Sequence, residues 1–254
     1  MAVQQQGPTT PARPRTIPPR PRPIGDRKTV ALRLVGGAVA LWALLFLIGL
    51  LVTKVLAPGQ APSADSKVDV WFAAHRTGFW DPLSAFGSRL ADTTTAIAVT
   101  IVVVLLLRWR LGRWYESWIV VAAITGELLV FLAVTATVNR PRPAVVLMDA
   151  APPTSSFPSG HTAASVALYG AIAVLLLWVY RRGPATRVAA VVLCCVPVVV
   201  GLSRLYRGMH YPSDVLVGAL GGGLWLLLVI KTLLPRQGTE ESDDEDPAVG
   251  VNRS

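Results

Sequence analysis

The chain has 254 residues, of which 52% are hydrophobic and only 15% charged, and its formal net charge is +9. The charged fraction is well below the roughly 25% of an average soluble domain. The apolar residues form long runs, which excludes both an ordinary soluble enzyme and a disordered chain. A helix of about 20 apolar residues is about 30 Å long, enough to cross the hydrocarbon core of a bilayer. The sequence therefore predicts a membrane protein.

The two ends of the chain differ in composition from the part between them. Residues 1–33 contain seven prolines and seven arginines and lysines. This composition predicts a disordered basic tail near anionic lipid headgroups or, alternatively, a ligand for a polyproline-binding module. Residues 235–254 include the acidic run EESDDED, which predicts a second disordered tail. The predicted membrane domain is residues 34–234.

Six apolar segments lie in this membrane domain, and each is expected to be a transmembrane helix. Only fully hydrogen-bonded helices or closed barrels span lipid, and the spacing of these segments does not fit barrel strands. The six segments are Leu34–Leu56, Thr93–Leu107, Trp118–Val138, Thr162–Tyr180, Val188–Leu205 and Val215–Leu234. The predicted fold class is therefore all-α, a polytopic membrane protein with six transmembrane helices.

The segment between the first two spans, Val68–Arg89, has aromatic and aliphatic residues near helical spacing. This pattern fits an amphipathic stretch in the membrane interface and equally fits a helix packed on the bundle. We expect Pro82 to divide the segment into two helices.

The distribution of arginine and lysine predicts the orientation in the membrane. The N-terminal tail, the loops after the second and fourth spans and the C-terminal end carry seven, three, three and three of these residues, which is 16 of the 24 in the chain. Because positive residues are enriched on the cytoplasmic side, we expect both termini to be cytoplasmic and the protein to lie in the cell (inner) membrane. The basic excess then reflects topology and not nucleic-acid binding.

Ionisable residues gather in the third and fifth loops, where the cost of charge near lipid calls for a functional reason. The third loop contains Arg140, Arg142 and Pro158-Ser159-Gly160-His161, and the fifth contains Ser203-Arg204, His210 and Asp214. Two spans separate these loops, so both emerge on the same membrane face. We expect a site at the outer ends of spans three to six.

This set of residues suits phosphoryl transfer. Arginines offer fixed, charge-assisted hydrogen bonds to phosphate oxygens. Ser159 and Gly160 precede the fourth span, where free backbone N–H groups and the helix dipole favour an anion. Two histidines allow one nucleophile and one acid, and Asp214 is placed to orient the ring of His210.

The motifs in these loops resemble the signature of the type 2 phosphatidic acid phosphatase superfamily, which is Lys-x6-Arg-Pro, Pro-Ser-Gly-His and Ser-Arg-x5-His-x3-Asp. The second and third motifs match residue for residue, and the first matches in Arg142-Pro143. With the six-span layout, the resemblance covers about Leu34–Leu234.

The resemblance implies a role for each matching position. His210 would attack phosphorus and form a phosphohistidine while Asp214 holds its ring, and His161 would protonate the leaving oxygen. The phosphate would be held by Arg142, Arg204, Ser159 and the amide of Gly160. The resemblance implies no metal and no cofactor.

One position departs from the family pattern. The family lysine corresponds to Thr135, which supplies no charge. Arg140 either replaces this lysine in the phosphate site or reaches lipid headgroups, and the sequence leaves both possibilities open.

Two features inside the spans need a separate explanation. Glu127 lies within the third span, where a carboxylate is costly, and the sequence leaves open whether it is protonated or bonded to a neighbouring helix. Gly221-Gly222-Gly223 in the sixth span indicates a close approach between helices.

Taken together, the sequence predicts a membrane enzyme that hydrolyses a lipid phosphomonoester or diphosphate at the outer membrane face. The expected substrates are a polyprenyl diphosphate carrier, which we favour, phosphatidic acid or phosphatidylglycerol phosphate. Lipid phosphotransfer through the same phosphohistidine and a catalytically silent lipid-binding or scaffold protein are the alternatives. The expected partners are the lipid substrate and the bilayer, with no nucleic acid, and the sequence does not identify a protein partner.

Overall fold

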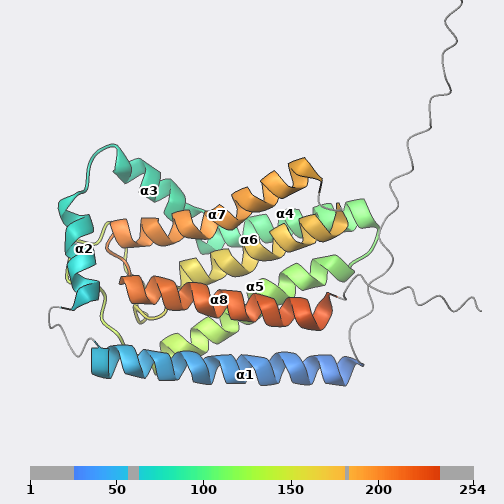
Figure 1. Ribbon diagram of the computed structural model, residues 1–254, viewed down its shortest axis with the longest axis horizontal. Coiled ribbons are helices and arrows are strands. Elements are labelled where there is room, and N and C mark those ends of the chain that lie inside the picture. Colours follow the sequence, from blue (N-terminus) through green and yellow to red (C-terminus); the bar gives the residue numbers. More distant parts are fainter. Residues whose placement is uncertain (1–25, 57–62, 181–182, 235–254) are drawn as a thin grey trace, which may run out of the picture.

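The computed structural model describes residues 26–56, 63–180 and 183–234, and all of the regular secondary structure within these ranges is helical. Figure 1 shows the helices in their order along the chain. They are α1 (Arg27–Leu51) with the short π-helix η1 (Val52–Leu56), α2 (Ala64–Ala74), α3 (Trp80–Arg89), α4 (Thr93–Leu111), α5 (Tyr115–Thr137), α6 (Gly160–Val179), α7 (Pro184–Tyr206) and α8 (Pro212–Leu233). Six of them are long and apolar enough to cross a membrane, namely α1 with η1 and α4 to α8. The predicted six-span all-α fold is confirmed.

The helices extend beyond the apolar runs, most of all at the start of α1. This helix begins at Arg27, where the side chain of Asp26 accepts a hydrogen bond from the Thr29 amide at 2.9 Å. The predicted tail of residues 1–33 is therefore wrong at its boundary, because residues 27–33 are helical. Apolar runs mark the part of a helix that lies in hydrocarbon, whereas capping residues set its ends. The rest of that tail, and the predicted tail of residues 235–254, lie outside the described residues.

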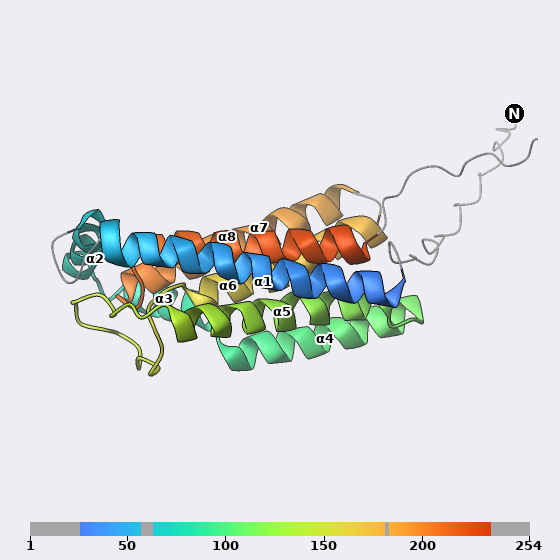
Figure 2. The same cartoon turned by 90° about the horizontal axis from the view of Figure 1, so that it is seen from below.

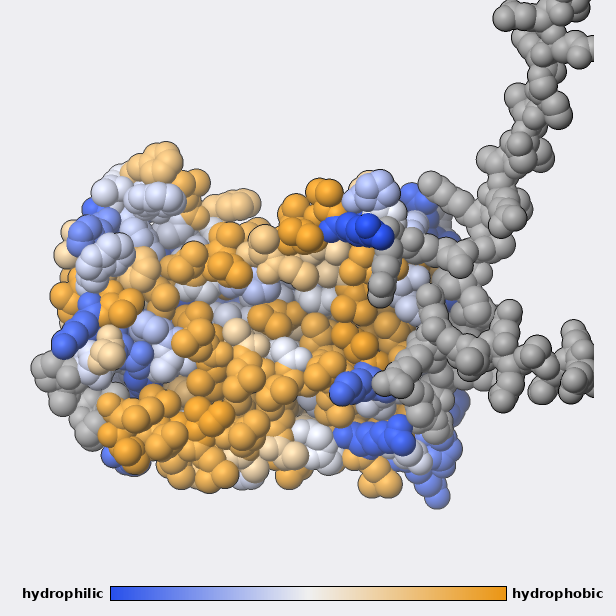
Figure 3. All heavy atoms as spheres, in the orientation of Figure 1, coloured by the Kyte–Doolittle hydropathy of each residue, from blue (hydrophilic) through white to orange (hydrophobic). Residues whose placement is uncertain are grey.

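The bundle is organised around α6, the most buried of the six candidate spans, which packs against α5, α7 and α8. Figure 2 shows the spans running side by side along the long axis of the molecule. The surface over the middle of the bundle is apolar, as the broad hydrophobic area in Figure 3 shows. This surface is the one that lipid tails would cover.

Two glycines on α8 allow this helix to lie against the start of α6. A Cβ added to Gly222 would lie 2.4 Å from the carbonyl oxygen of Ala163, and one added to Gly218 would lie 2.5 Å from that of Ser159. Both obstacles are backbone atoms, which have little freedom to move aside. The predicted close helix approach is confirmed for the Gly221-Gly222-Gly223 segment, and it holds the end of α6 that begins at Gly160.

We expect Gly222→Ala to displace α6 from α8 and to lower thermal stability and activity together. The matched control is Gly223→Ala, because a Cβ added at Gly223 has its nearest neighbour at 3.9 Å and therefore fits. Melting temperatures of the two purified variants in detergent measure the difference. Equal melting temperatures would show that the backbone contact at Gly222 does not limit the packing.

The α2–α3 segment lies at the end of the bundle where α7 ends and α8 begins (Figure 1). The predicted break at Pro82 is wrong: the two helices are separated at residues 75–79, and Pro82 lies in the first turn of α3. Proline is tolerated there because an amide in the first turn has no intrahelical partner.

The face of α3 that packs on the bundle consists of small residues, Ser84, Gly87 and Ser88. Its aromatic residue Phe86 is 64% exposed, and Phe79, which immediately precedes the helix, is 68% exposed. The apolar pattern of this segment is therefore not a packing face, and it suits the membrane interface.

Candidate active site

The third and fifth loops meet at one end of the bundle, together with the start of α4 (Figure 2). A cleft of roughly 500 Å³ opens there. Five of the eight predicted site residues line it: Arg142, Gly160, His161, Arg204 and His210. The cleft continues between α4 and α5 along apolar side chains, among them Ile97, Ile101, Leu128 and Phe131. A charged end and an apolar continuation are thus parts of one cavity.

The ring of His210 is buried and held by a backbone carbonyl. Its Nδ1 lies 2.7 Å from the carbonyl oxygen of Ser156. Because a carbonyl oxygen only accepts hydrogen bonds, Nδ1 carries the proton, and the lone pair of the neutral ring is on Nε2. Burial lowers the pKa of His210 well below its ordinary value, and the positive charges of Arg204 and Arg142 lower it further. Both effects favour the neutral ring that a nucleophile requires.

Asp214 supports this ring indirectly, in contrast to the expected direct contact. Its Oδ2 lies 3.9 Å from Nδ1 of His210, too far for a hydrogen bond. Instead, this oxygen accepts hydrogen bonds from the Ser156 hydroxyl at 2.5 Å and from the Tyr211 amide at 3.0 Å. Asp214 therefore fixes the two backbone segments on either side of the histidine ring.

The two arginines of the cleft each have an unsatisfied group. Arg142 donates to the carbonyl oxygen of Met209 at 2.7 Å, and Arg204 donates to Ser88 at 2.7 Å and to Asp149 at 2.9 Å. The Nε of Arg142 and the Nε of Arg204 are buried without a hydrogen-bond partner among the described residues. Because buried donors are nearly always paired in native proteins, these two groups indicate a site for an anionic ligand.

His161 lines the same cleft from the first turn of α6 and is held by Asp92. The distance between His161 Nε2 and Asp92 Oδ1 is 2.9 Å. Ser159, by contrast, does not reach the cleft, although it was expected to hold phosphate. It is fully buried, and its hydroxyl lies 3.0 Å from that of Thr162. Gly160, the next residue, does line the cleft.

The structure places Arg140 away from the phosphate site, so the interpretation that it replaces the family lysine is not supported. Arg140 donates to Asp214, to Ser213 at 2.7 Å and to Asp65 at 2.8 Å. Its guanidinium also lies 4.1 Å from the centre of the Tyr211 ring. With its donors occupied by two carboxylates, Arg140 holds Asp214 in place and does not face the cleft.

Sequence reasoning missed the acidic partners of this site. Asp149 of the third loop accepts hydrogen bonds from both Arg204 and Arg207. Asp92 and Asp65 lie at or next to the starts of α4 and α2, where an acidic residue is commonly a helix cap. Their spacing in the sequence gives no signal for these long-range contacts. Within the described ranges, no group of three or more His, Cys, Asp and Glu side chains is arranged to hold a metal ion.

Asp69 of α2 is a buried carboxyl group beside this network, and both of its oxygens lack a hydrogen-bond partner. Burial raises its pKa to about 8, and the neighbouring charges of Asp65 and Asp214 contribute to the rise. The folded protein therefore binds this proton more tightly than the unfolded chain. It follows that the free energy of unfolding falls as the pH rises from about 4 towards about 8.

We expect Asp69→Asn, which stays uncharged at every pH, to remove this loss. The melting temperature of the wild type should fall relative to that of Asp69→Asn between pH 5 and pH 8.5. Thermal unfolding in detergent at a series of pH values measures this difference. A difference that is constant across the series would show that Asp69 does not titrate in the folded state.

Residues 115–237 match the family model of the PAP2 superfamily. This part of the chain is a PAP2 domain. The PAP2 domain includes α5 to α8 and the third and fifth loops, so it contains all eight predicted site residues. The resemblance found in the motifs is confirmed.

Curated proteins are similar to part of this chain. Phosphatidylglycerophosphatase B from Escherichia coli (strain K12) is 44% identical over 84 residues, which are 32% of this chain and 30% of that protein. Lipid A 1-phosphatase from Rhizobium etli is 36% identical over 83 residues, which are 33% of this chain and 31% of that protein. The matches thus span less than a third of the length of these relatives.

Two solved structures share the fold of most of this chain. A transmembrane PAP2 type phosphatidylglycerolphosphate phosphatase from Bacillus subtilis has a TM-score of 0.65 at 19% identity, over 78% of this chain and 94% of that chain. LpxE from Aquifex aeolicus has a TM-score of 0.52 at 22% identity, over 68% of this chain and 98% of that chain. At these identities the likeness shows the fold.

Proposed function

We propose that this protein is an integral membrane lipid phosphatase that removes phosphate from a lipid phosphomonoester or diphosphate through a phosphohistidine on His210. One observation carries the proposal. His161 and His210 line a cleft whose other wall is apolar. Arg142 and Arg204 line the same cleft, and each has an Nε–H group without a hydrogen-bond partner among the described residues. The similarity to proteins named as lipid phosphatases supports it.

In the proposed reaction, Nε2 of His210 forms a bond to phosphorus while the bond from phosphorus to the lipid oxygen breaks. His161 gives a proton to the departing oxygen, and the lipid alcohol or lipid monophosphate leaves. Water then attacks the phosphohistidine and passes a proton to His161, which releases inorganic phosphate and restores both rings. The protonated Nδ1 of His210, bound to the Ser156 carbonyl, keeps Nε2 available for the first step.

The negative charge on the transferring phosphoryl group would be stabilised by fixed donors. These are the Nε groups of Arg142 and Arg204, which have no hydrogen-bond partner in the described part of the chain, and the amide of Gly160 at the start of α6. A helix N-terminus has free N–H groups and a positive dipole end. Asp92 would be a positioning residue, because it holds the ring of His161 at the edge of the cleft.

The lipid part of the substrate would lie in the apolar continuation of the cleft between α4 and α5, open towards the bilayer. The basic residues in the last turn of α4 and in the loop that follows it, such as Arg108 and Arg113, lie at the opposite end of the bundle from the cleft. Because basic residues favour the cytoplasmic side, the cleft would face the outside and both termini the cytoplasm.

The test is a phosphate-release assay of purified protein in detergent with phosphatidic acid, phosphatidylglycerol phosphate and a polyprenyl diphosphate, each with excess chelator and no added alcohol. We expect inorganic phosphate from at least one lipid under these conditions. Loss of release with chelator would contradict the metal-independent mechanism. Transfer of the phosphoryl group to an added alcohol, with no inorganic phosphate formed in its absence, would indicate phosphotransfer. Neither release nor transfer from any lipid would indicate a lipid-binding protein without activity.

A further inference from the structure

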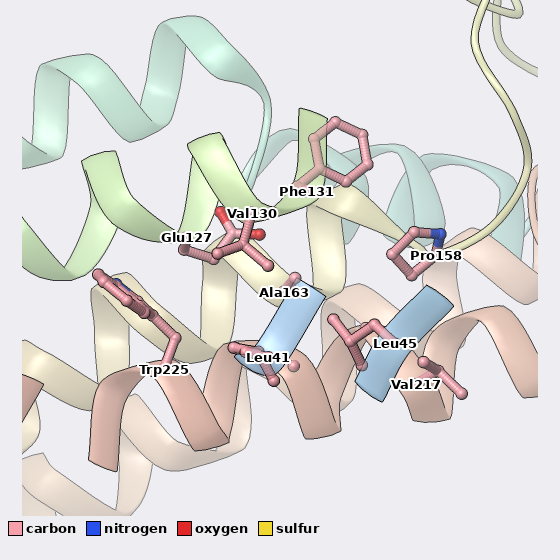
Figure 4. Close-up of a pocket in the computed structure, with 12 residues that line it drawn as sticks. Leu41, Leu45, Glu127, Val130, Phe131, Pro158, Ala163, Val217 and Trp225 are labelled. Carbon is pink, nitrogen blue, oxygen red and sulfur yellow. The ribbon is translucent and has the colours of Figure 1, made fainter. Parts of the chain in front are cut away.

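Glu127 of α5 is a buried carboxyl group that the proposed reaction does not use. It is 4% exposed, and it has no hydrogen bond or ion pair among the described residues. It lines the active-site cleft together with His161 and His210. On its other side it borders a small apolar cavity. Figure 4 shows it there among Val130, Trp225, Phe131 and Leu41.

The surroundings of Glu127 favour its uncharged form. A carboxylate without a counter-ion in hydrocarbon is far more costly than a neutral acid in the same place. A neutral carboxyl group keeps one O–H donor, and a donor left without a partner is itself unfavourable in an apolar cavity. The group therefore lacks a hydrogen-bond acceptor, and a molecule in the cleft is positioned to supply one.

The depth of Glu127 follows from its neighbour Phe131. A Cβ added to Gly160 would lie 2.8 Å from the Phe131 ring, so Phe131 is level with the amide proposed to bind phosphate. Glu127 precedes Phe131 by four residues, and α5 runs towards the active-site end. Four residues of helix rise about 6 Å, so Glu127 lies roughly one turn deeper in the membrane than Gly160.

We propose that Glu127 is a specificity-determining residue that donates a hydrogen bond to an ester carbonyl of an acylated glycerolipid phosphate. This inference rests on the proposed function and names its substrate class. In such a lipid, a carbonyl group follows the phosphate after a few bonds, and four or five bonds of about 1.5 Å each reach about 6 Å. A polyprenyl diphosphate has only hydrocarbon at this depth. The inference therefore reverses our preference from the sequence for a polyprenyl carrier.

The test compares two lipids that differ only in the carbonyl groups: diester-linked phosphatidic acid and its diether-linked analogue. The measured quantity is the ratio of kcat/KM for the ester lipid to that for the ether lipid. In the wild type we expect a ratio above one. Glu127→Leu fills the apolar site without a donor, and we expect the ratio to fall by about five- to tenfold, the effect of one hydrogen bond.

A second variant and a control make the result specific. Glu127→Gln keeps a neutral donor of nearly the same shape, so we expect its ratio to stay within about twofold of the wild type. Leu129→Ala is the control on the same helix, because Leu129 is exposed on the outer surface and does not line the cleft. A polyprenyl diphosphate serves as a third substrate and should respond to Glu127→Leu as the ether lipid does.

The outcomes separate this inference from the proposed function. Phosphate release with the same ester-to-ether ratio in the wild type and Glu127→Leu overturns the inference and leaves the lipid phosphatase proposal standing. A wild type that prefers the polyprenyl diphosphate and ignores the ester group has the same consequence. If the wild type releases phosphate from none of these lipids, the proposed function fails, and the inference fails with it.

Discussion

His210→Ala is expected to abolish phosphate release, with a loss of at least about 10³-fold in kcat. The variant removes the atom that would bond to phosphorus, and the other histidine of the cleft does not take its place. That residue, His161, lies in the first turn of α6, and its ring is held by Asp92 at the start of α4. The measurement is release of inorganic phosphate from the best lipid substrate. In addition, radiolabelled substrate should leave acid-labile label on the wild-type protein and none on the variant.

His75→Ala is the matched control for this experiment. His75 lies at the end of α2 and does not line the cleft. Its ring stacks on that of Trp71, and its Nδ1 lies 2.7 Å from the Trp71 carbonyl oxygen. We expect this variant to keep the wild-type rate. Label that persists on His210→Ala, or a rate within tenfold of the wild type, would rule out a phosphohistidine at this position.

Arg140→Gln is expected to destabilise the fold by about 3 kcal/mol and to lower activity as a consequence. Asp214 is fully buried and Arg140 is 5% exposed, so the variant leaves a buried carboxylate without its cation. Removing one partner of a buried ion pair typically costs about 3–5 kcal/mol. Chemical or thermal unfolding in detergent measures the loss of stability. The double variant Arg140→Gln/Asp65→Asn should recover part of this loss, because it neutralises one of the two carboxylates, Asp65 and Asp214, that pair with Arg140.

Arg142→Gln provides the comparison. Among the described residues, the guanidinium of Arg142 donates only to the Met209 carbonyl oxygen, and its Nε has no acceptor. We therefore expect this variant to lose phosphate binding and turnover with little loss of stability. If Arg140→Gln instead keeps the wild-type stability and loses turnover as Arg142→Gln does, Arg140 binds phosphate as the sequence first suggested.

The contrast between these two arginines shows where sequence reasoning succeeds and where it fails. Both precede a proline and lie two residues apart in the third loop, and both carry the same charge. One faces the cleft, and the other faces Asp65 and Asp214. The side chain of a loop residue points towards the partner with which it forms hydrogen bonds, and this partner can come from a distant part of the chain. Asp65, which binds Arg140, lies in α2, 75 positions earlier in the sequence.

The sequence by itself determined the six spans, the shared membrane face of the two polar loops and the motif residues that line the cleft. These follow from local properties: hydrophobic length sets a span, and an even number of spans returns the chain to the same face. Tertiary structure decided how those residues are held. Ser156 holds the ring of His210, Asp149 joins two arginines, and Glu127 faces the cleft. Each depends on long-range packing of helices, because the position of a polar partner around a helix and its depth in the bundle are fixed only when the helices meet.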